Sequence, residues 1–143
     1  MPAKPIAKDF EILDHTADVG IIAYGVDLTQ AFTNAARGMF SLIIEPKNVR
    51  GVLRREVSVS ATDTESLLVE WLNELIYLFD TENFLGKRFE INELDCTHLK
   101  AIVYGEKVDR TRHHIKIGIK ATTYHMLEIK HNNGYQARVL FDI

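Results

Sequence analysis

Residues 125–141 read HMLEIKHNNGYQARVLF, a stretch in which two strand patterns flank the pair Asn133-Gly134. Both residue types adopt left-handed backbone conformations at low cost, and Asn-Gly between two strand patterns is the strongest short signal for a β-hairpin. We therefore predict strands over residues 125–131 and 136–141, paired in the antiparallel direction through a turn at residues 132–134. The hairpin indicates that the strands of this chain form an antiparallel sheet.

The segment before the hairpin alternates between apolar residues and polar or small ones. Apolar residues at every second position predict a half-buried strand, and here they are Ile115, Ile117, Ile119 and Ala121. Runs rich in β-branched and aromatic residues predict four further strands, over residues 19–24, 56–61, 88–94 and 99–104.

Two amphipathic helices are predicted between these strands. The first begins at the N-cap Asp27, with Gln30 as its capping-box partner, and ends before Pro46. The second begins at Thr62, with Glu65 as the partner in its capping box. Both carry an apolar stripe at helical spacing: Leu28, Ala31, Phe32, Ala35, Ala36, Met39, Phe40 and Ile43 in the first, and Leu68, Trp71, Leu72, Leu75, Ile76 and Phe79 in the second. The predicted fold is therefore α+β: one domain over residues 1–143, mainly an antiparallel β-sheet with the two helices packed on one face.

The composition excludes several classes of protein. A chain of 143 residues with a net charge of −3 suits one globular domain and does not suit a protein that binds nucleic acid by bulk charge alone. The single cysteine, Cys96, excludes an internal disulfide and a cysteine-rich zinc site. No apolar run reaches the length of about 20 residues that spans a membrane, and the first residues lack the hydrophobic stretch of a signal peptide. We therefore expect a cytoplasmic protein with no membrane segment.

The nucleophiles and histidines give little sign of catalysis. No glycine-rich phosphate loop and no nucleophile-elbow sequence is present. Cys96 lies two positions from His98, but a plain turn or buried cysteine is the commoner arrangement. His113 and His114 are adjacent and would point to opposite faces of a strand, so we interpret both as solvated strand residues.

Basic residues gather in the segment 107–120, which holds Lys107, Arg110, Arg112, Lys116 and Lys120 against Asp109 alone. Such a segment could meet RNA phosphate or an acidic partner surface. A solvent-facing sheet edge, kept from aggregating by its lysine and arginine side chains, is the commoner explanation.

Acidic residues stand near both ends of the chain. Asp14 and Asp18 flank His15, and Asp142 precedes the terminal carboxylate of Ile143. If the fold brings the two ends together, these hard oxygen donors form a site for a cation. The alternatives are turn residues for Asp14 and Asp18 and a frayed chain end for Asp142. His15 would either bond to loop backbone or orient the acidic site.

Four blocks spread over the chain resemble the archease family. They are residues 14–21 with 23–25 (DHTADVGI and AYG), residues 28–40 (LTQAFTNAARGMF), residues 120–125 (KATTYH) and residues 139–143 (VLFDI). The first and last blocks are the specific ones, and neither departs from the family pattern.

The resemblance implies a non-enzymatic protein cofactor of the RtcB-type tRNA-splicing ligase. That ligase joins RNA ends with manganese and GTP through a histidine–GMP intermediate. Archeases promote its guanylylation and multiple turnover and relax its nucleotide preference. The resemblance also implies a divalent-cation site, with calcium as in the family and magnesium or manganese as alternatives. Its ligands would be Asp18, Asp142 and Ile143. His15, Asp14 and Lys120 are further candidates, for the surroundings of the metal or for docking to the ligase, and contact with tRNA is expected to be indirect.

Two other classes of function stay open from the residues alone. A stand-alone metal-dependent phosphohydrolase could use the same carboxylates, although no base, nucleophile or phosphate loop stands beside them in the sequence. A chaperone-like adaptor would need only a sheet edge and a basic strand. Turnover without a ligase would identify the first, and a broad range of partners the second.

Overall fold

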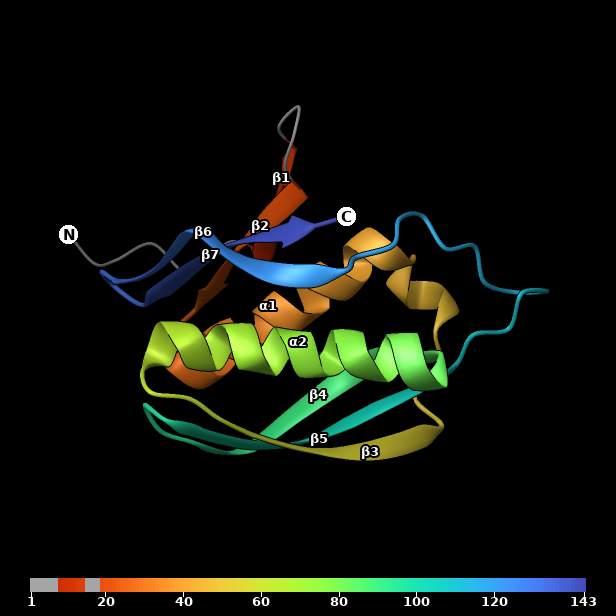
Figure 1. The fold of residues 1–143 in the computed structure, drawn as a ribbon, viewed down its shortest axis with the longest axis horizontal. Helices are drawn as coiled ribbons and strands as arrows, with labels where there is room; N and C mark the ends of the chain where they lie inside the picture. The colour runs from red at the N-terminus through yellow and green to blue at the C-terminus, as the bar shows by residue number, and fades with distance from the viewer. Residues whose placement is uncertain (1–7, 15–18) are drawn as a thin grey trace.

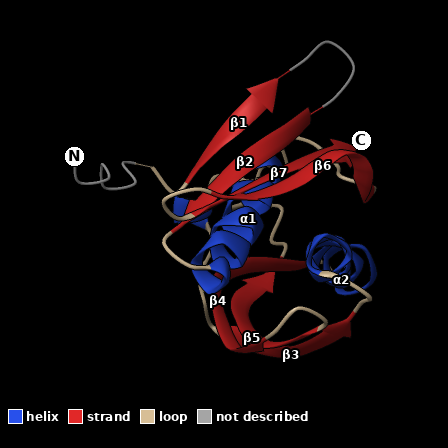
Figure 2. Cartoon of the chain, turned by 90° about the vertical axis from the view of Figure 1, so that its left-hand side faces the viewer, coloured by secondary structure: helices blue, strands red, loops and turns tan. Residues whose placement is uncertain are grey.

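The computed structural model describes residues 8–14 and 19–143 of the chain. In this part of the chain, seven strands form two antiparallel sheets, and both helices lie between the sheets (Figures 1 and 2). The strand order is β1-β2-β7-β6 in the larger sheet and β3-β5-β4 in the smaller one. The predicted α+β class with antiparallel pairing is confirmed, and the predicted sheet is divided in two.

The larger sheet joins both ends of the chain. It consists of β1 (Phe10–Asp14), β2 (Val19–Gly25), β7 (Tyr135–Asp142) and β6 (Ala121–His131). The predicted hairpin is confirmed: His131 faces Tyr135 across the turn, and Asn133 and Gly134 have positive φ angles of 54° and 111°. These backbone angles are the ones that asparagine and glycine tolerate best, which is why the pair sets the turn.

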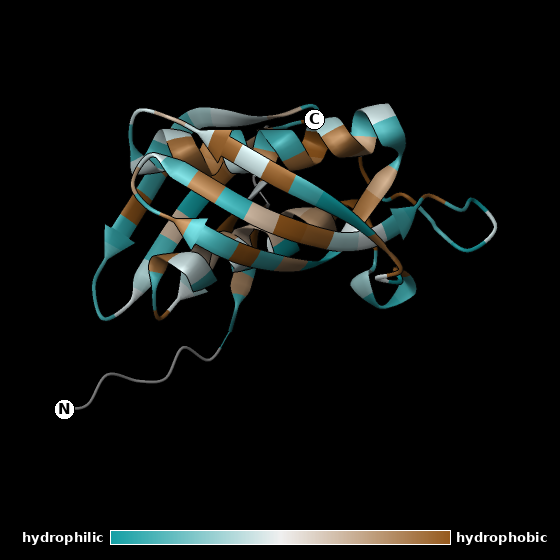
Figure 3. Ribbon diagram, turned by 90° about the horizontal axis from the view of Figure 1, so that it is seen from below, coloured by the Kyte–Doolittle hydropathy of each residue, from teal (hydrophilic) through white to brown (hydrophobic). Residues whose placement is uncertain are grey.

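The smaller sheet consists of β3 (Leu53–Ser60), β5 (His98–Lys107) and β4 (Phe84–Leu94). Buried and exposed residues alternate along β5, because successive side chains of a strand point to opposite faces. Figure 3 shows the same alternation as teal and brown bands along the strands. One face of this sheet therefore packs on the helices while the other meets solvent.

Helix α1 (Leu28–Ile43) begins at the predicted N-cap, since the Asp27 carboxylate accepts a 2.8 Å hydrogen bond from the amide of Gln30. The side chain of Gln30 accepts from the amide of Val26, one residue before the partner that a capping box predicts. The helix ends at Ile43, and the 3-10 turn η1 (Pro46–Asn48) follows.

Helix α2 (Thr64–Glu82) begins one residue later than predicted. Its N-cap is Asp63, whose carboxylate accepts from the amide of Ser66 at 2.8 Å, so the predicted cap at Thr62 with Glu65 is wrong. A carboxylate is favoured at this position because its charge also meets the positive end of the helix dipole.

The core lies between the sheets and is organised around Trp71, the only tryptophan of the chain. Its side chain is fully buried, its indole nitrogen donates to the carbonyl oxygen of Phe32 at 3.0 Å, and its ring meets Phe89 edge to face. This hydrogen bond joins α2 to α1 inside the core, where an indole N–H needs a partner.

The predicted strand over residues 115–121 is not formed before Ala121. Residues 113–120 belong to no strand, although Ile115, Ile117 and Ile119 are half-buried or buried as the alternation indicates. The amide of Lys116 bonds instead to the carbonyl of Ile43 at the end of α1. Alternation of apolar and polar residues indicates which side chains face the core. It does not require that the segment pair with a neighbouring strand.

Candidate functional site

The two acidic ends of the chain are joined by the pairing of β2 with β7. Val19, the first residue of β2, is the Cα partner of Phe141 in β7. In the sequence, the predicted metal ligands Asp18 and Asp142 are the chain neighbours of these two residues. Asp18 and His15 themselves lie outside the described residues.

Three strand ends meet at this corner of the larger sheet. Asp14, the last residue of β1, pairs with Val19, and Val19 pairs with Phe141. The end of β1, the start of β2 and the end of β7 are therefore neighbours (Figure 2). The register thus brings the backbones of Asp14 and Asp142 to the same end of the sheet, as a site built from residues near both ends of the sequence requires.

Asp142 is exposed, and its main chain is held by β6. It faces Ala121 in the β6–β7 ladder, and its carbonyl oxygen accepts a 2.7 Å hydrogen bond from the amide of Lys120. Among the described residues, the Asp142 carboxylate makes no hydrogen bond or ion pair. Ile143 is 48% exposed, so both residues of this proposed donor pair, Asp142 and Ile143, are open to solvent.

These donors are chemically suited to a hard divalent cation, because calcium, magnesium and manganese all prefer oxygen ligands. Among the side chains that the structure describes, no three of the His, Cys, Asp or Glu type are grouped to hold a metal ion. Asp18 is the further donor that the sequence predicts beside Asp142 and Ile143.

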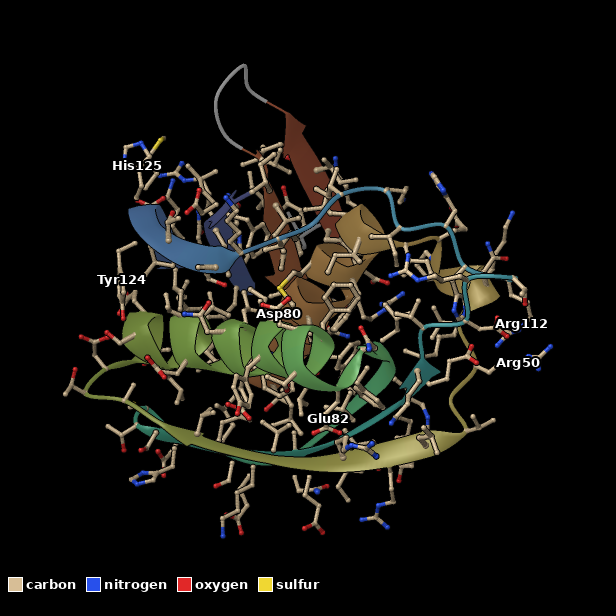
Figure 4. The ribbon with its side chains drawn as sticks, turned by 45° about the vertical axis from the view of Figure 1, so that its right-hand side comes forward. Arg50, Asp80, Glu82, Arg112, Tyr124 and His125 are labelled. Atoms are coloured by element: carbon tan, nitrogen blue, oxygen red, sulfur yellow. The ribbon has the colours of Figure 1, made fainter. Side chains whose placement is uncertain are left out.

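Strand β6 carries a large bulge a few residues from this corner. Thr123 pairs with Leu140 and Glu128 with Arg138, so four residues of β6 stand opposite one residue of β7. Met126 in the bulge has a φ of 55°, and Tyr124 and Met126 are more than half exposed. Figure 4 shows Tyr124 and His125 reaching outward from β6. The bulge displays apolar side chains and prevents edge-to-edge pairing of β6.

A second cluster, which the sequence interpretation missed, surrounds Glu106 on β5. Its side chain is 8% exposed and accepts from the Arg112 guanidinium at 2.5 Å and from the Arg50 amide at 2.6 Å. The ring of His113, whose side chain has no exposure, contacts the same carboxylate at 3.2 Å. The interpretation of His113 as a solvated residue is wrong. His113 continues the series of Ile115, Ile117 and Ile119 at every second position, and this alternation was the signal that its side chain faces inward.

The charge of Glu106 is stabilised by this surrounding. Burial raises the pKa of its carboxyl, but the hydrogen bonds from Arg112 and from the Arg50 amide, with the positive charge of Arg112, outweigh burial and hold the pKa below its ordinary value. Arg112 also bonds to Asp109, and its own pKa is raised, chiefly by the hydrogen bond to Glu106. Glu106 is therefore an ionised, buried anchor.

Fold and site together define an α+β protein with a helix pair between two antiparallel sheets and a corner, carrying the exposed Asp142, where the end of β1 and the start of β2 meet the end of β7. Residues 10–143 match the model of the Archease protein family (MTH1598/TM1083). The chain belongs to the archease family.

Relatives support this assignment over nearly the whole chain. A protein archease of Methanosarcina mazei is 40% identical over 148 aligned positions that cover all of both chains. One from Methanothermobacter thermautotrophicus is 38% identical and covers 95% of this chain and 99% of its own.

Solved structures share the fold. The solution structure of Methanobacterium thermoautotrophicum protein 1598 superposes with a TM-score of 0.80 at 39% identity, covering 94% of this chain and 99% of its own. The crystal structure of a Thermotoga maritima protein described as an archease and possible chaperone has a TM-score of 0.58 at 19% identity, covering 100% and 98%. The second likeness concerns the fold alone. Neither helix in the described part of the chain combines the length and the hydropathy that spanning a membrane requires.

Proposed function

We propose that this chain is a non-enzymatic activator of an RtcB-type tRNA-splicing RNA ligase. It promotes guanylylation and multiple turnover of the ligase and alters which nucleoside triphosphates the ligase accepts. Membership of the archease family supports the proposal, together with the sequence blocks at residues 14–21 and 139–143. The observation that carries it is the pairing of Val19 with Phe141, which joins these two blocks in one sheet.

The activating element is a divalent cation held by Asp18, Asp142 and the terminal carboxylate of Ile143. Calcium suits such a site because it accepts irregular sets of oxygen ligands, and magnesium or manganese are the alternatives. When bound, the cation supplies positive charge at an exposed corner of the protein, where a ligase can reach it. Asp14 lies at the same corner, and Lys120 is tied to Asp142 through the backbone.

The chain's own residues position this corner against the partner. The β6–β7 ladder holds the backbone of Asp142, so its carboxylate projects from paired strands. The β6 bulge places Tyr124 and Met126, both exposed, a few residues from the Lys120–Asp142 bond. Aromatic side chains and methionine are enriched in protein interfaces, so this bulge is the surface we assign to docking with the ligase.

Guanylylation of the ligase, measured with the ligase substoichiometric, tests the proposal. Asp18→Ala, Asp142→Asn and removal of Ile143 should each abolish most of the activation. Glu93→Gln is the matched control, because this β4 carboxylate is also exposed and makes only a 3.8 Å ion pair with Lys100. Full activation by all three site variants would sink the proposal.

Two further measurements distinguish the remaining classes of function. Incubation of the protein with nucleotides and divalent metals, in the absence of ligase, should give no hydrolysis, whereas turnover would indicate a phosphohydrolase. Binding to the ligase should be selective, whereas comparable binding to many unrelated clients would indicate a chaperone-like adaptor. Fractionation of cells should place the protein in the cytoplasm.

A further inference from the structure

A small polar hollow lies at the right-hand end of the molecule in Figure 4, and none of its lining residues belongs to the acidic corner. It has a volume of about 300 Å³ and is lined by Lys47, Asn48, Arg50 and Arg112. Figure 4 shows Arg50 and Arg112 at this end, beside the segment that follows β5. Three basic residues from η1, from the loop before β3 and from the segment after β5 thus converge on one concave surface.

The Glu106 cluster holds these segments together. One oxygen of Glu106 accepts from the guanidinium of Arg112, and the other accepts from the backbone amide of Arg50. The bond to the amide holds the backbone from which the Arg50 side chain extends. The bond to Arg112 holds its guanidinium directly, so one buried carboxylate positions both cations.

His113 fixes the third segment. Its Nδ1 accepts a 2.8 Å hydrogen bond from the amide of Asp109, so Nε2 carries the proton and donates to the carbonyl oxygen of Asn48 at 2.9 Å. This bond attaches η1, with Lys47, to the segment after β5. A buried glutamate and a buried histidine, neither used at the acidic corner, therefore preorganise a basic surface.

The charge around the hollow is opposite to that of the whole protein. Residues 45–50 and 106–116 carry six Lys and Arg against three Asp and Glu, while the whole chain has a net charge of −3. Within the described residues, the side chains of Lys47 and Arg50 have no hydrogen-bond or ion-pair partner, and Arg50 is exposed. Two cations are therefore free to meet an anion, and they stand beside the guanidinium of Arg112, which is held by Glu106 and Asp109 through two of its three nitrogens.

We propose that this hollow binds a phosphate group of a nucleic-acid strand. A concave surface of fixed guanidinium and ammonium groups suits the compact tetrahedral phosphate better than the dispersed carboxylates of an acidic protein. Lys107 at the end of β5 is exposed, as are Arg110 and Lys116 on the segment after it, and these residues extend the positive charge of this part of the chain, as binding a polymer of phosphates requires. The proposal goes beyond activation of the ligase and does not depend on the metal site.

Fluorescence polarisation with a labelled single-stranded RNA of about 20 nucleotides tests the proposal. The variant Lys47→Gln/Arg50→Gln removes two cations from the hollow and leaves the backbone bond to Glu106 in place. The matched control, Lys100→Gln/Lys130→Gln, removes two exposed cations from β5 and β6 and changes the net charge equally. Comparison of the two variants separates the hollow from bulk charge.

We expect the hollow variant to bind the RNA at least about tenfold more weakly and the control to stay within about twofold of the wild type. The slope of log affinity against log salt should fall by about 1.4 in the hollow variant only, as for two lost contacts with a single strand. Inorganic phosphate should shift the amide resonances of Arg50 and Arg112. A DNA strand of the same sequence shows whether the sugar contributes.

Three results would overturn the proposal. They are an equal loss of binding in both variants, no saturable binding of RNA or DNA by the wild type, and tighter binding of poly-glutamate than of RNA. The last result would assign the hollow to an acidic protein.

Discussion

Lys120 donates its backbone amide proton to the carbonyl oxygen of Asp142, with 2.7 Å between nitrogen and oxygen. The bond comes one residue before the position where Ala121 faces Asp142, and it ties the start of β6 to the end of β7. Because β7 is a central strand, the Asp142 carboxylate extends from backbone that is already ordered. A ligand held in this way loses little conformational entropy when a cation binds.

Asp142→Asn should weaken calcium binding at least about tenfold, because the amide keeps the shape of the side chain and removes its charge. Isothermal titration calorimetry with calcium, magnesium and manganese measures the effect without any ligase. Glu93→Gln, an exposed carboxylate on β4, should leave the affinity unchanged. Equal calcium affinities of Asp142→Asn and the wild type would remove Asp142 from the site.

The protein should lose stability in acid through Glu106. The pKa of its carboxyl in the folded state lies below the ordinary value of 4.5, so the stability it contributes is present above that pH and is lost as the pH falls through the folded-state pKa. Glu106→Gln should cost about 2 kcal/mol at neutral pH, because the guanidinium of Arg112 loses its buried charged partner and keeps only the exposed Asp109 carboxylate.

Urea unfolding between about pH 7 and pH 3 measures this dependence. The pKa values of Asp63, Asp95 and Asp109 are also lowered, so both proteins should become less stable in acid. The difference in the free energy of unfolding between the wild type and Glu106→Gln should become smaller as the pH falls. A difference that stays constant over this range would contradict the assignment.

Asp63→Ala should destabilise the protein by about 1 kcal/mol, the usual cost of losing an N-cap. Thr62→Ala should change the free energy of unfolding by less than about 0.5 kcal/mol, because Asp63 and not Thr62 caps α2. Chemical unfolding followed by the fluorescence of the buried Trp71 compares the two. A larger effect at Thr62 would show that the helix begins one residue earlier.

Gly134→Ala should destabilise the β6–β7 hairpin by about 1–2 kcal/mol, since Gly134 has a φ of 111° that an alanine adopts only with strain. Gly118→Ala is the matched control: a Cβ there would meet nothing within 4 Å, and Gly118 does not have a left-handed φ. The control should be neutral or stabilise by about 0.5 kcal/mol. Thermal unfolding measures whether each variant is less or more stable than the wild type. Equal effects of the two substitutions would argue against a strained turn.

Much of the fold was predictable because its signals are local. The Asn133-Gly134 turn, the N-cap Asp27 and the apolar stripes of both helices each depend on residues within a few positions of one another. The strand predicted over residues 115–121 was wrong before Ala121, since the alternation there records burial against the core and not pairing. Strand β1 was missed because its five residues give a weak pattern.

The acidic corner was predictable in part. The sequence singled out Asp18 and Asp142 only on the assumption that the chain ends meet, and the β2–β7 register brings their neighbours Val19 and Phe141 together. The Glu106 cluster was not predictable, because Arg50 and Glu106 are 56 positions apart and no short pattern links them.

Local patterning in the amino-acid sequence thus accounts for the hairpin, the two helices and the α+β class, whereas the residues proposed to bind metal came from the resemblance to the archease family. Three features depend on contacts between distant segments: the division of the strands into two sheets, the meeting of β1, β2 and β7 at one corner, and the burial of Glu106 and His113. The physical reason is the separation along the chain of the residues that interact. Turns and caps are stabilised by neighbours along the chain, whereas sheet order and buried ion pairs form only when the whole core packs.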